Sequence, residues 1–180
     1  MLIRIGPSHG AGDVVDALLE CHERIRAFTD LALRLAVTAG LSAAEVRDAA
    51  ASVHRYFSVA LPLHARDEEE SVLPRLLGKD ARVDRELAEM QREHAEHGGA
   101  VSRVLAACAE LKERPEALPR IAPGLADAAR ELAHHFEAHL AREERVIFPA
   151  VHTHLDRDTR AAVHAEMRAR RGAAVDPAPG

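Results

Sequence analysis

Two segments of the chain carry the same spacing of residues that could bind a metal ion. His64 is followed four residues later by Glu68, and His139 is followed four residues later by Glu143; a second Glu comes next in both segments. A proline lies ten residues after each histidine, so the two segments align without a gap, as internal repeats do. Residues four apart on a helix differ by about 40° in direction and about 6 Å in height. Each His–Glu pair can therefore reach one metal ion.

Two further histidines complete the pattern. His22 and His94 each lie within the apolar stripe of their own segment, and each precedes one of the His–Glu pairs. In an antiparallel bundle, two halves related by an approximate twofold axis would bring four imidazoles and two carboxylates together. That set is large enough to hold two metal ions, with each carboxylate bridging them. Burying it without a metal would leave unpaired polar groups, which is costly.

The elements that must position these residues are helices. The chain has 36 Ala and 20 Leu but only five aromatic residues, a balance that favours helices over strands. Apolar spacing, caps and prolines predict helices over residues 13–40, 42–78, 80–113, 124–151 and 157–171, with a kink at Pro62 in the second. Long amphipathic helices joined by short loops predict an all-α, up-down-up-down four-helix bundle with an additional short C-terminal helix.

These segments divide the chain into four parts. We expect an N-terminal extension over residues 1–12, the four-helix bundle over 13–155, the C-terminal helix over 156–171 and a disordered tail over 172–180. The tail sequence GAAVDPAPG has little to bury.

Charge and composition exclude several classes of function. The net charge is −5, and the 24 basic residues are mixed with acidic ones, which disfavours nucleic-acid binding. No apolar run approaches the roughly 20 residues that span a bilayer, so we expect no membrane partner. Two cysteines are too few for a disulfide framework, and the N-terminus lacks the features of a secretory signal. These features predict a cytoplasmic protein.

Other metal sites fit the sequence less well. A ferritin-like di-iron site needs two Glu-x-x-His motifs, whereas this chain has one, from Glu131 to His134. The His-Glu-x-x-His motif of zinc proteases is absent. Neither cysteine has a partner at the spacing of a structural zinc site.

The sequence resembles the hemerythrin-like proteins, also called the HHE cation-binding domain, over about residues 13–151. The resemblance rests on His22, LPLHARDEEESVLP, His94 in REHAEH, and HLAREERVIFP. It implies an up-down four-helix bundle that holds two iron ions, which an oxygen atom could bridge. By the same resemblance, one iron would be bound by His22 and His64 and the other by His94 and His139. Glu68 and Glu143 would bridge them.

One position departs from the oxygen-carrying members of the family. They have a second histidine four residues after the one on the third helix, where this chain has Gly98. His97 and His135 are possible replacement ligands, since His97 lies in the same stripe as His94 and His135 lies one turn before His139. Iron commonly takes about six ligands, so one imidazole fewer leaves a position for water or substrate. Dedicated oxygen carriage is therefore disfavoured.

Three functions remain open. The leading hypothesis is a non-haem di-iron protein that binds or senses dioxygen, nitric oxide or iron, rather than an enzyme. The alternative is a di-iron enzyme that acts on peroxide or dioxygen. In the third, the bundle holds a structural metal such as zinc. All three make small molecules or metal ions the partners, and none names a protein partner.

Overall fold

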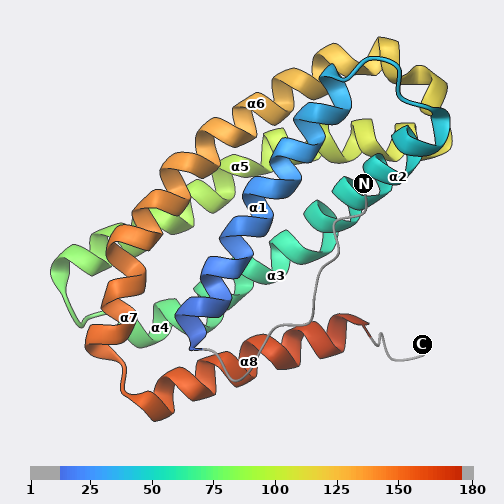
Figure 1. The fold of residues 1–180 in the computed structure, drawn as a ribbon. Helices are drawn as coiled ribbons and strands as arrows, with labels where there is room; N and C mark the ends of the chain where they lie inside the picture. The colour runs from blue at the N-terminus through green and yellow to red at the C-terminus, as the bar shows by residue number, and fades with distance from the viewer. Residues whose placement is uncertain (1–12, 176–180) are drawn as a thin grey trace.

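The structure is a computed structural model that describes residues 13–175, and this part of the chain is helical without strands (Figure 1). The prediction of an all-α fold is confirmed. The α-helices are α1 (Val14–Val37), α2 (Ala43–Arg55), α3 (Leu61–Arg66), α4 (Leu73–Leu76), α5 (Ala81–Glu113), α6 (Leu118–Arg142), α7 (Phe148–His154) and α8 (Arg157–Val175). Three π-helical turns, η1 (Tyr56–Ala60), η2 (Asp67–Val72) and η4 (Glu143–Ile147), and one 3₁₀ turn, η3 (Pro115–Ala117), complete the order.

Four long helical segments lie side by side. In Figure 1, α1 packs against α6 and α2, while α5 packs against α2 and α6. The second segment is made of α2, η1, α3, η2 and α4, and the fourth is made of α6, η4 and α7. The additional C-terminal helix α8 crosses the end of the molecule where α4 and α7 lie, and it contacts η2 and α1.

Local sequence signals explain where the helices begin. The Ser42 side chain accepts a hydrogen bond from the Glu45 backbone N–H, and the Glu45 carboxylate accepts one from the Ser42 N–H (2.8 Å). This capping box satisfies two donors that the first turn of α2 leaves free. The Asp80 side chain does the same for α5 by accepting from the Arg82 and Val83 amides. Between α1 and α2, Gly40 adopts a φ of 76°, a conformation that glycine adopts without strain.

The interior consists of two apolar clusters separated by a polar layer. The first cluster includes buried residues from all four long segments: Ile25, Leu35, Phe57, Val104, Leu111, Leu132, Phe136 and Leu140. The second lies toward α8 and includes Leu18, Val72, Leu76, Leu87, Met90, Ile147, Phe148, Val163 and Met167. Along α1, His22 lies between Leu18 of the second cluster and Ile25 of the first. The candidate metal-binding side chains therefore form a polar layer between the two apolar clusters.

The long helices differ from the expected ones at their prolines. Each π-helical turn ends two residues before a proline, at Pro62, Pro74 and Pro149. A proline inside a helix has no N–H to donate to the preceding turn and clashes with it. A π-helical turn absorbs this misfit, and such turns are frequent at functional sites. The π-helical turn before Pro62, where the sequence predicted a kink, thus has counterparts before the two prolines of the repeat.

Two helix boundaries also differ. α6 begins at Leu118 rather than near residue 124, with Pro119 in its first turn, where no N–H is needed. α8 continues to Val175, four residues beyond the expected end at 171, so part of the expected disordered tail is helical. The expected N-terminal extension over residues 1–12 and the last five residues of the expected tail lie outside the described residues. Within residues 13–175, no helix combines the length and apolar character needed to cross a bilayer.

Candidate metal centre

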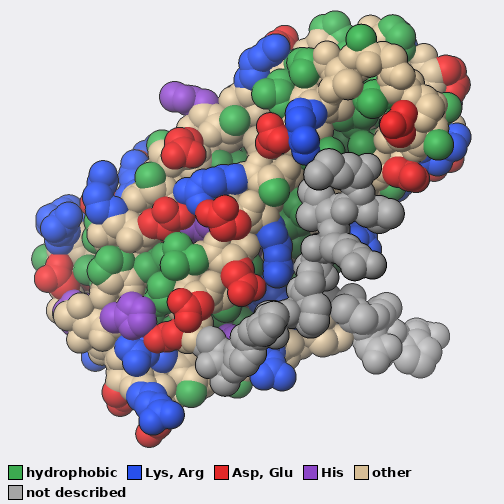
Figure 2. Space-filling model, in the orientation of Figure 1, with side chains coloured by type: hydrophobic (Ala, Val, Ile, Leu, Met, Phe, Trp, Pro, Cys, Tyr) green, Lys and Arg blue, Asp and Glu red, His purple; other side chains and the backbone are tan. Residues whose placement is uncertain are grey.

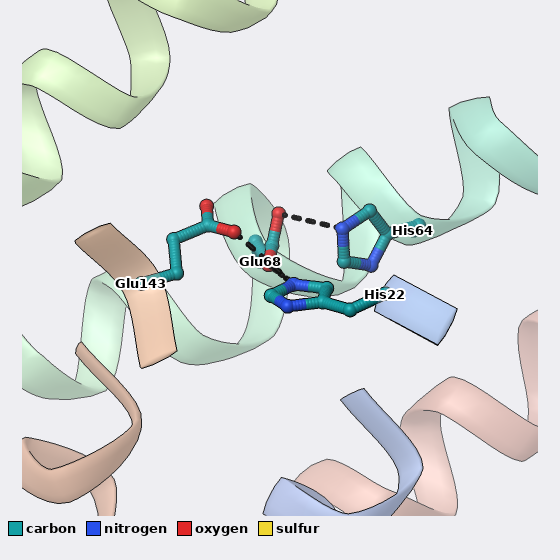
Figure 3. Close-up of side chains that lie close together, drawn as sticks. All are labelled: His22, His64, Glu68 and Glu143. Atoms are coloured by element: carbon teal, nitrogen blue, oxygen red, sulfur yellow. Dashed lines mark ion pairs between the residues drawn. The ribbon is translucent and has the colours of Figure 1, made fainter. Parts of the chain in front are cut away.

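The first cluster of candidate ligands comes from four elements. His22 lies on α1, His64 on α3, Glu68 on η2 and Glu143 on η4, and their side chains point toward one another (Figure 3). The His22 Nε2 atom lies 3.2 Å from Glu143 Oε2 and 3.9 Å from Glu68 Oε1. The His64 Nε2 atom lies 3.5 Å from Glu68 Oε2. All four side chains are buried.

The second cluster shares both carboxylates with the first. His94 on α5 and His139 on α6 join Glu68 and Glu143 there. The His94 Nε2 atom lies 3.3 Å from Glu68 Oε2 and 3.2 Å from His139 Nε2, and His139 Nε2 lies 3.2 Å from Glu143 Oε1. Each carboxylate therefore contacts histidines of both halves of the chain. In each cluster the candidate ligand atoms lie within 4.8 Å of one another.

These contacts have the spacing of metal ligands. Two ligand atoms that are each about 2.1 Å from one metal ion lie about 3.0 to 3.4 Å apart at right-angled or tetrahedral geometry. Most of the separations above are close to that range. Within residues 13–175, neither oxygen of Glu68 or Glu143 has a hydrogen-bond partner, and neither has the Nε2 atom of His22 or His64. Since buried polar atoms are normally paired, the residues present fit a metal ion that pairs them.

Three of the histidines have a carboxylate on the far side of the ring. The Nδ1–H of His22 donates to Glu144 (2.8 Å), that of His94 donates to Glu69 (2.8 Å), and that of His139 donates to Glu93 (2.9 Å). Because a carboxylate can only accept, the neutral ring carries its proton on Nδ1 and keeps the Nε2 lone pair free. Histidines that bind metals in proteins almost always have such a partner.

The sequence alone pointed to only two of the three glutamates that accept hydrogen bonds from these rings. The glutamates at 69 and 144 are the second Glu of each repeated segment, directly after Glu68 and Glu143. Glu93 was missed. It precedes His94 on α5, yet it reaches His139 on the neighbouring helix α6. No spacing rule within one helix would have found it, because the contact depends on how α5 and α6 cross.

The pKa values of the four histidines divide into two pairs. Burial opposes protonation in all four rings, but the close Glu143 and Glu68 carboxylates raise the pKa of His22 to about 10. Contacts with the same Glu68 raise the pKa of His94 to about 9 despite its burial. Burial lowers the pKa of His64 to about 4 and that of His139 to about 3. Of the four rings, His22 and His94 are therefore the ones protonated at neutral pH in the metal-free centre.

The two bridging candidates also differ. Burial and the neighbouring Glu68 carboxylate raise the pKa of Glu143 to about 8. The surrounding His64, His22 and His94 rings outweigh burial at Glu68 and hold its pKa well below the usual value. Two carboxylates that share one small volume cannot both keep a full charge cheaply, so one of them takes a proton. A divalent cation would remove that conflict.

The two possible replacement ligands lie beside the second cluster. The His97 ring is buried against Phe136 and His139, with a centroid separation of 5.0 Å from His139, and it stacks on His135 at 5.7 Å. Neither belongs to the two clusters found in residues 13–175. Gly98 is exposed, and a Cβ atom added there would meet nothing within 4 Å. On α5, the side chain at position 97 is therefore buried in the bundle, whereas position 98 is exposed.

We expect His97→Ala to bind as much iron per chain as the wild type, because its ring packs against a candidate ligand without joining either cluster. Metal analysis after loading checks this. Loss of an iron ion from His97→Ala, with the His135→Ala variant unaffected, would make His97 a ligand.

Comparison with known proteins agrees with this geometry. No curated protein matches the chain. A family model described as the Hemerythrin HHE cation binding domain matches residues 13–151. The match includes all six candidate ligands and ends before α8. It covers most of the chain and confirms the resemblance found in the sequence, so the chain belongs to the hemerythrin HHE cation-binding domain family.

Proposed function

We propose that the centre binds two iron ions and that the protein binds or senses dioxygen, nitric oxide or iron itself. One observation carries the proposal: two clusters of buried His and Glu side chains share both carboxylates, and most of their inward-facing atoms lack a hydrogen-bond partner within residues 13–175. Carboxylates that bridge two ions in the core of a helical bundle are characteristic of di-iron proteins.

The proposed ligand sets follow the two clusters. His22 and His64 would hold one ion, and His94 and His139 the other, with Glu68 and Glu143 bridging them. Iron would supply exchangeable electrons and open coordination positions for a small molecule. The chain's own residues supply the rest: Glu144, Glu69 and Glu93 orient three of the rings, and the apolar clusters on both sides keep bulk water out.

The proposal extends to the arrangement of the chain. We propose that the four long segments run up-down-up-down through residues 13–155, followed by a separate C-terminal helix, and the path of the ribbon in Figure 1 supports this. Small molecules are the proposed partners. Acidic and basic side chains are intermixed on the face seen in Figure 2, in keeping with the expectation that nucleic acid is not a partner.

The enzyme remains a second candidate because of one feature of the second cluster. With glycine at 98, α5 contributes only His94 to the clusters of the described residues. The second cluster then has two imidazoles and two shared carboxylates, no more than the first, so an ion in either cluster has fewer than the six ligands that iron commonly takes. A vacant position suits a reversible ligand and also suits turnover of peroxide or dioxygen.

Spectroscopy of the iron-loaded protein separates these functions. We expect the visible spectrum to change when dioxygen or nitric oxide is added and to return when the gas is removed. Steady consumption of peroxide that is lost in Glu143→Gln would favour the enzyme. A protein that takes up zinc in preference to iron, with no spectral response to either gas, would refute the binding or sensing role.

A further inference from the structure

The C-terminal helix α8 lies outside the residues that match the family, yet one of its faces contacts residues directly beside the metal centre. Val163 and Met167 are buried in the second apolar cluster. Arg170 and Arg171 follow Met167 after three and four residues, so they continue the same face of α8 one turn later. α8 therefore presents two apolar side chains and then two guanidinium groups to the bundle.

Both guanidinium groups hold one buried carboxylate. Asp67 is completely buried and directly precedes Glu68 in the π-helical turn η2. Arg170 Nη1 donates to Asp67 Oδ1 (2.8 Å), and Arg171 Nη2 forms an ion pair with Asp67 Oδ2 (2.7 Å). A carboxylate in this position is stable only if it is paired, because removing a charge from water is costly. The two arginines of α8 supply that pairing.

Further contacts join α8 to the same turn and to α1. Arg170 Nη2 donates to the hydroxyl of Ser71 (2.6 Å), and that hydroxyl donates to Glu166 (2.6 Å). Arg171 Nη2 lies 3.5 Å from the Sγ atom of Cys21, the residue before His22. The helix thus contacts the chain beside two of the candidate ligands, Glu68 on η2 and His22 on α1.

The second repeated segment has a different partner at the position equivalent to Asp67. Arg142 occupies the position in the second segment that Asp67 occupies in the first, directly before the bridging glutamate. Its guanidinium lies 3.1 Å from Glu89 and 3.3 Å from Glu93, both on α5. In the second half, a neighbouring long helix holds the residue before Glu143. In the first half, α8 holds the residue before Glu68, with the charges reversed.

We propose that Arg170 and Arg171 are positioning residues of the metal centre, which act through Asp67 to fix the turn carrying Glu68 and so slow the release of metal. This inference rests on the proposed metal binding. α8 then stabilises the metal centre, although it contributes no ligand.

The test measures the release of ferrous iron from the full-length protein into an excess of chelator, without oxygen. We expect release to be at least about tenfold faster in Asp67→Asn and in the Arg170→Gln/Arg171→Gln double variant, the lower end of the effect of losing an outer partner of a metal ligand. Combining all three changes should add little to either. Arg168→Gln, an exposed arginine on the same helix, is the control and should release iron at the wild-type rate.

Helix content and the amount of iron bound at saturation are measured in parallel, since positioning should change the rate and leave both nearly unaltered. Asp67→Asn leaves no completely buried charge among these contacts, and Arg170 keeps its ion pair with Glu70, so this variant provides the test if the double arginine variant does not fold. Wild-type release rates in Asp67→Asn would overturn the inference. So would fast release that occurs only in the arginine variants. A wild-type protein that binds no iron would overturn the proposed function, and this inference with it.

Discussion

Replacing Glu68 by glutamine is expected to lower the affinity for iron by more than about 100-fold. The Glu68 carboxylate contacts the Nε2 atoms of three histidines, one in each of three different helices. Those rings stabilise the negative charge of Glu68, which is why the pKa of this carboxyl lies well below its usual value. Glutamine has nearly the same shape but no charge, so the variant should fold while the bridge between the two ions is lost. Equilibrium titration with ferrous iron measures the change.

Two further variants give a scale against which the effect of Glu68→Gln can be compared. Loss of a carboxylate that only orients a ligand costs about 10- to 100-fold in metal affinity, and Glu93→Gln should lie in that range because Glu93 contacts His139 through Nδ1. Glu137→Gln is the matched control, since this carboxylate is 72% exposed on α6 near His139. Equal affinities for Glu68→Gln and Glu137→Gln would contradict the assignment of Glu68.

Binding of metal should release about three protons at pH 7. His22 and His94 have pKa values of about 10 and 9 in the metal-free protein, so both rings are protonated at neutral pH. A metal ion needs their Nε2 lone pairs and must displace those protons. The Glu143 carboxyl, with a pKa of about 8, is also mostly protonated at pH 7 and loses its proton when it binds. His64 and His139, with pKa values of about 4 and 3, are already neutral and add nothing at this pH.

The sign of the pH dependence follows from these values. Because a raised pKa keeps a group protonated below that pKa, the affinity should fall as the pH falls, by about 1000-fold per unit for three protons between pH 6 and pH 7 and less steeply toward pH 8, where Glu143 titrates. Calorimetry in buffers of different ionisation enthalpy counts the protons directly. An affinity that stays constant from pH 6 to pH 8 would contradict the arrangement of His22 and His94 against the two carboxylates.

The sequence predicted that the candidate ligand side chains lie together because their spacing follows helical geometry. The spacing from His64 to Glu68 and from His139 to Glu143 depends only on the helical repeat, and the structure brings both pairs together with His22 and His94. The all-helical fold follows from the same periodicity. The positions of these side chains are set locally, so a rule about one helix at a time is sufficient.

Features that depend on two elements were not predictable in this way. The contact of Glu93 with His139 requires the crossing of α5 and α6, and the contacts of Arg170 and Arg171 with Asp67 require the docking of α8. The π-helical turns at Glu68 and Glu143 arise because the following prolines remove helical hydrogen bonds, and their form depends on the packing around them. In each case the feature depends on how elements that are distant in the sequence pack against one another.

The number of iron ions bound per chain tests the central claim most directly. Full-length protein is titrated with ferrous iron without oxygen, and the metal content is measured at saturation together with that of His64→Ala. Two clusters that share Glu68 and Glu143 predict an end point of two ions per wild-type chain and a lower one for the variant. An end point of one ion or none, or one that His64→Ala leaves unchanged, would contradict the di-iron centre.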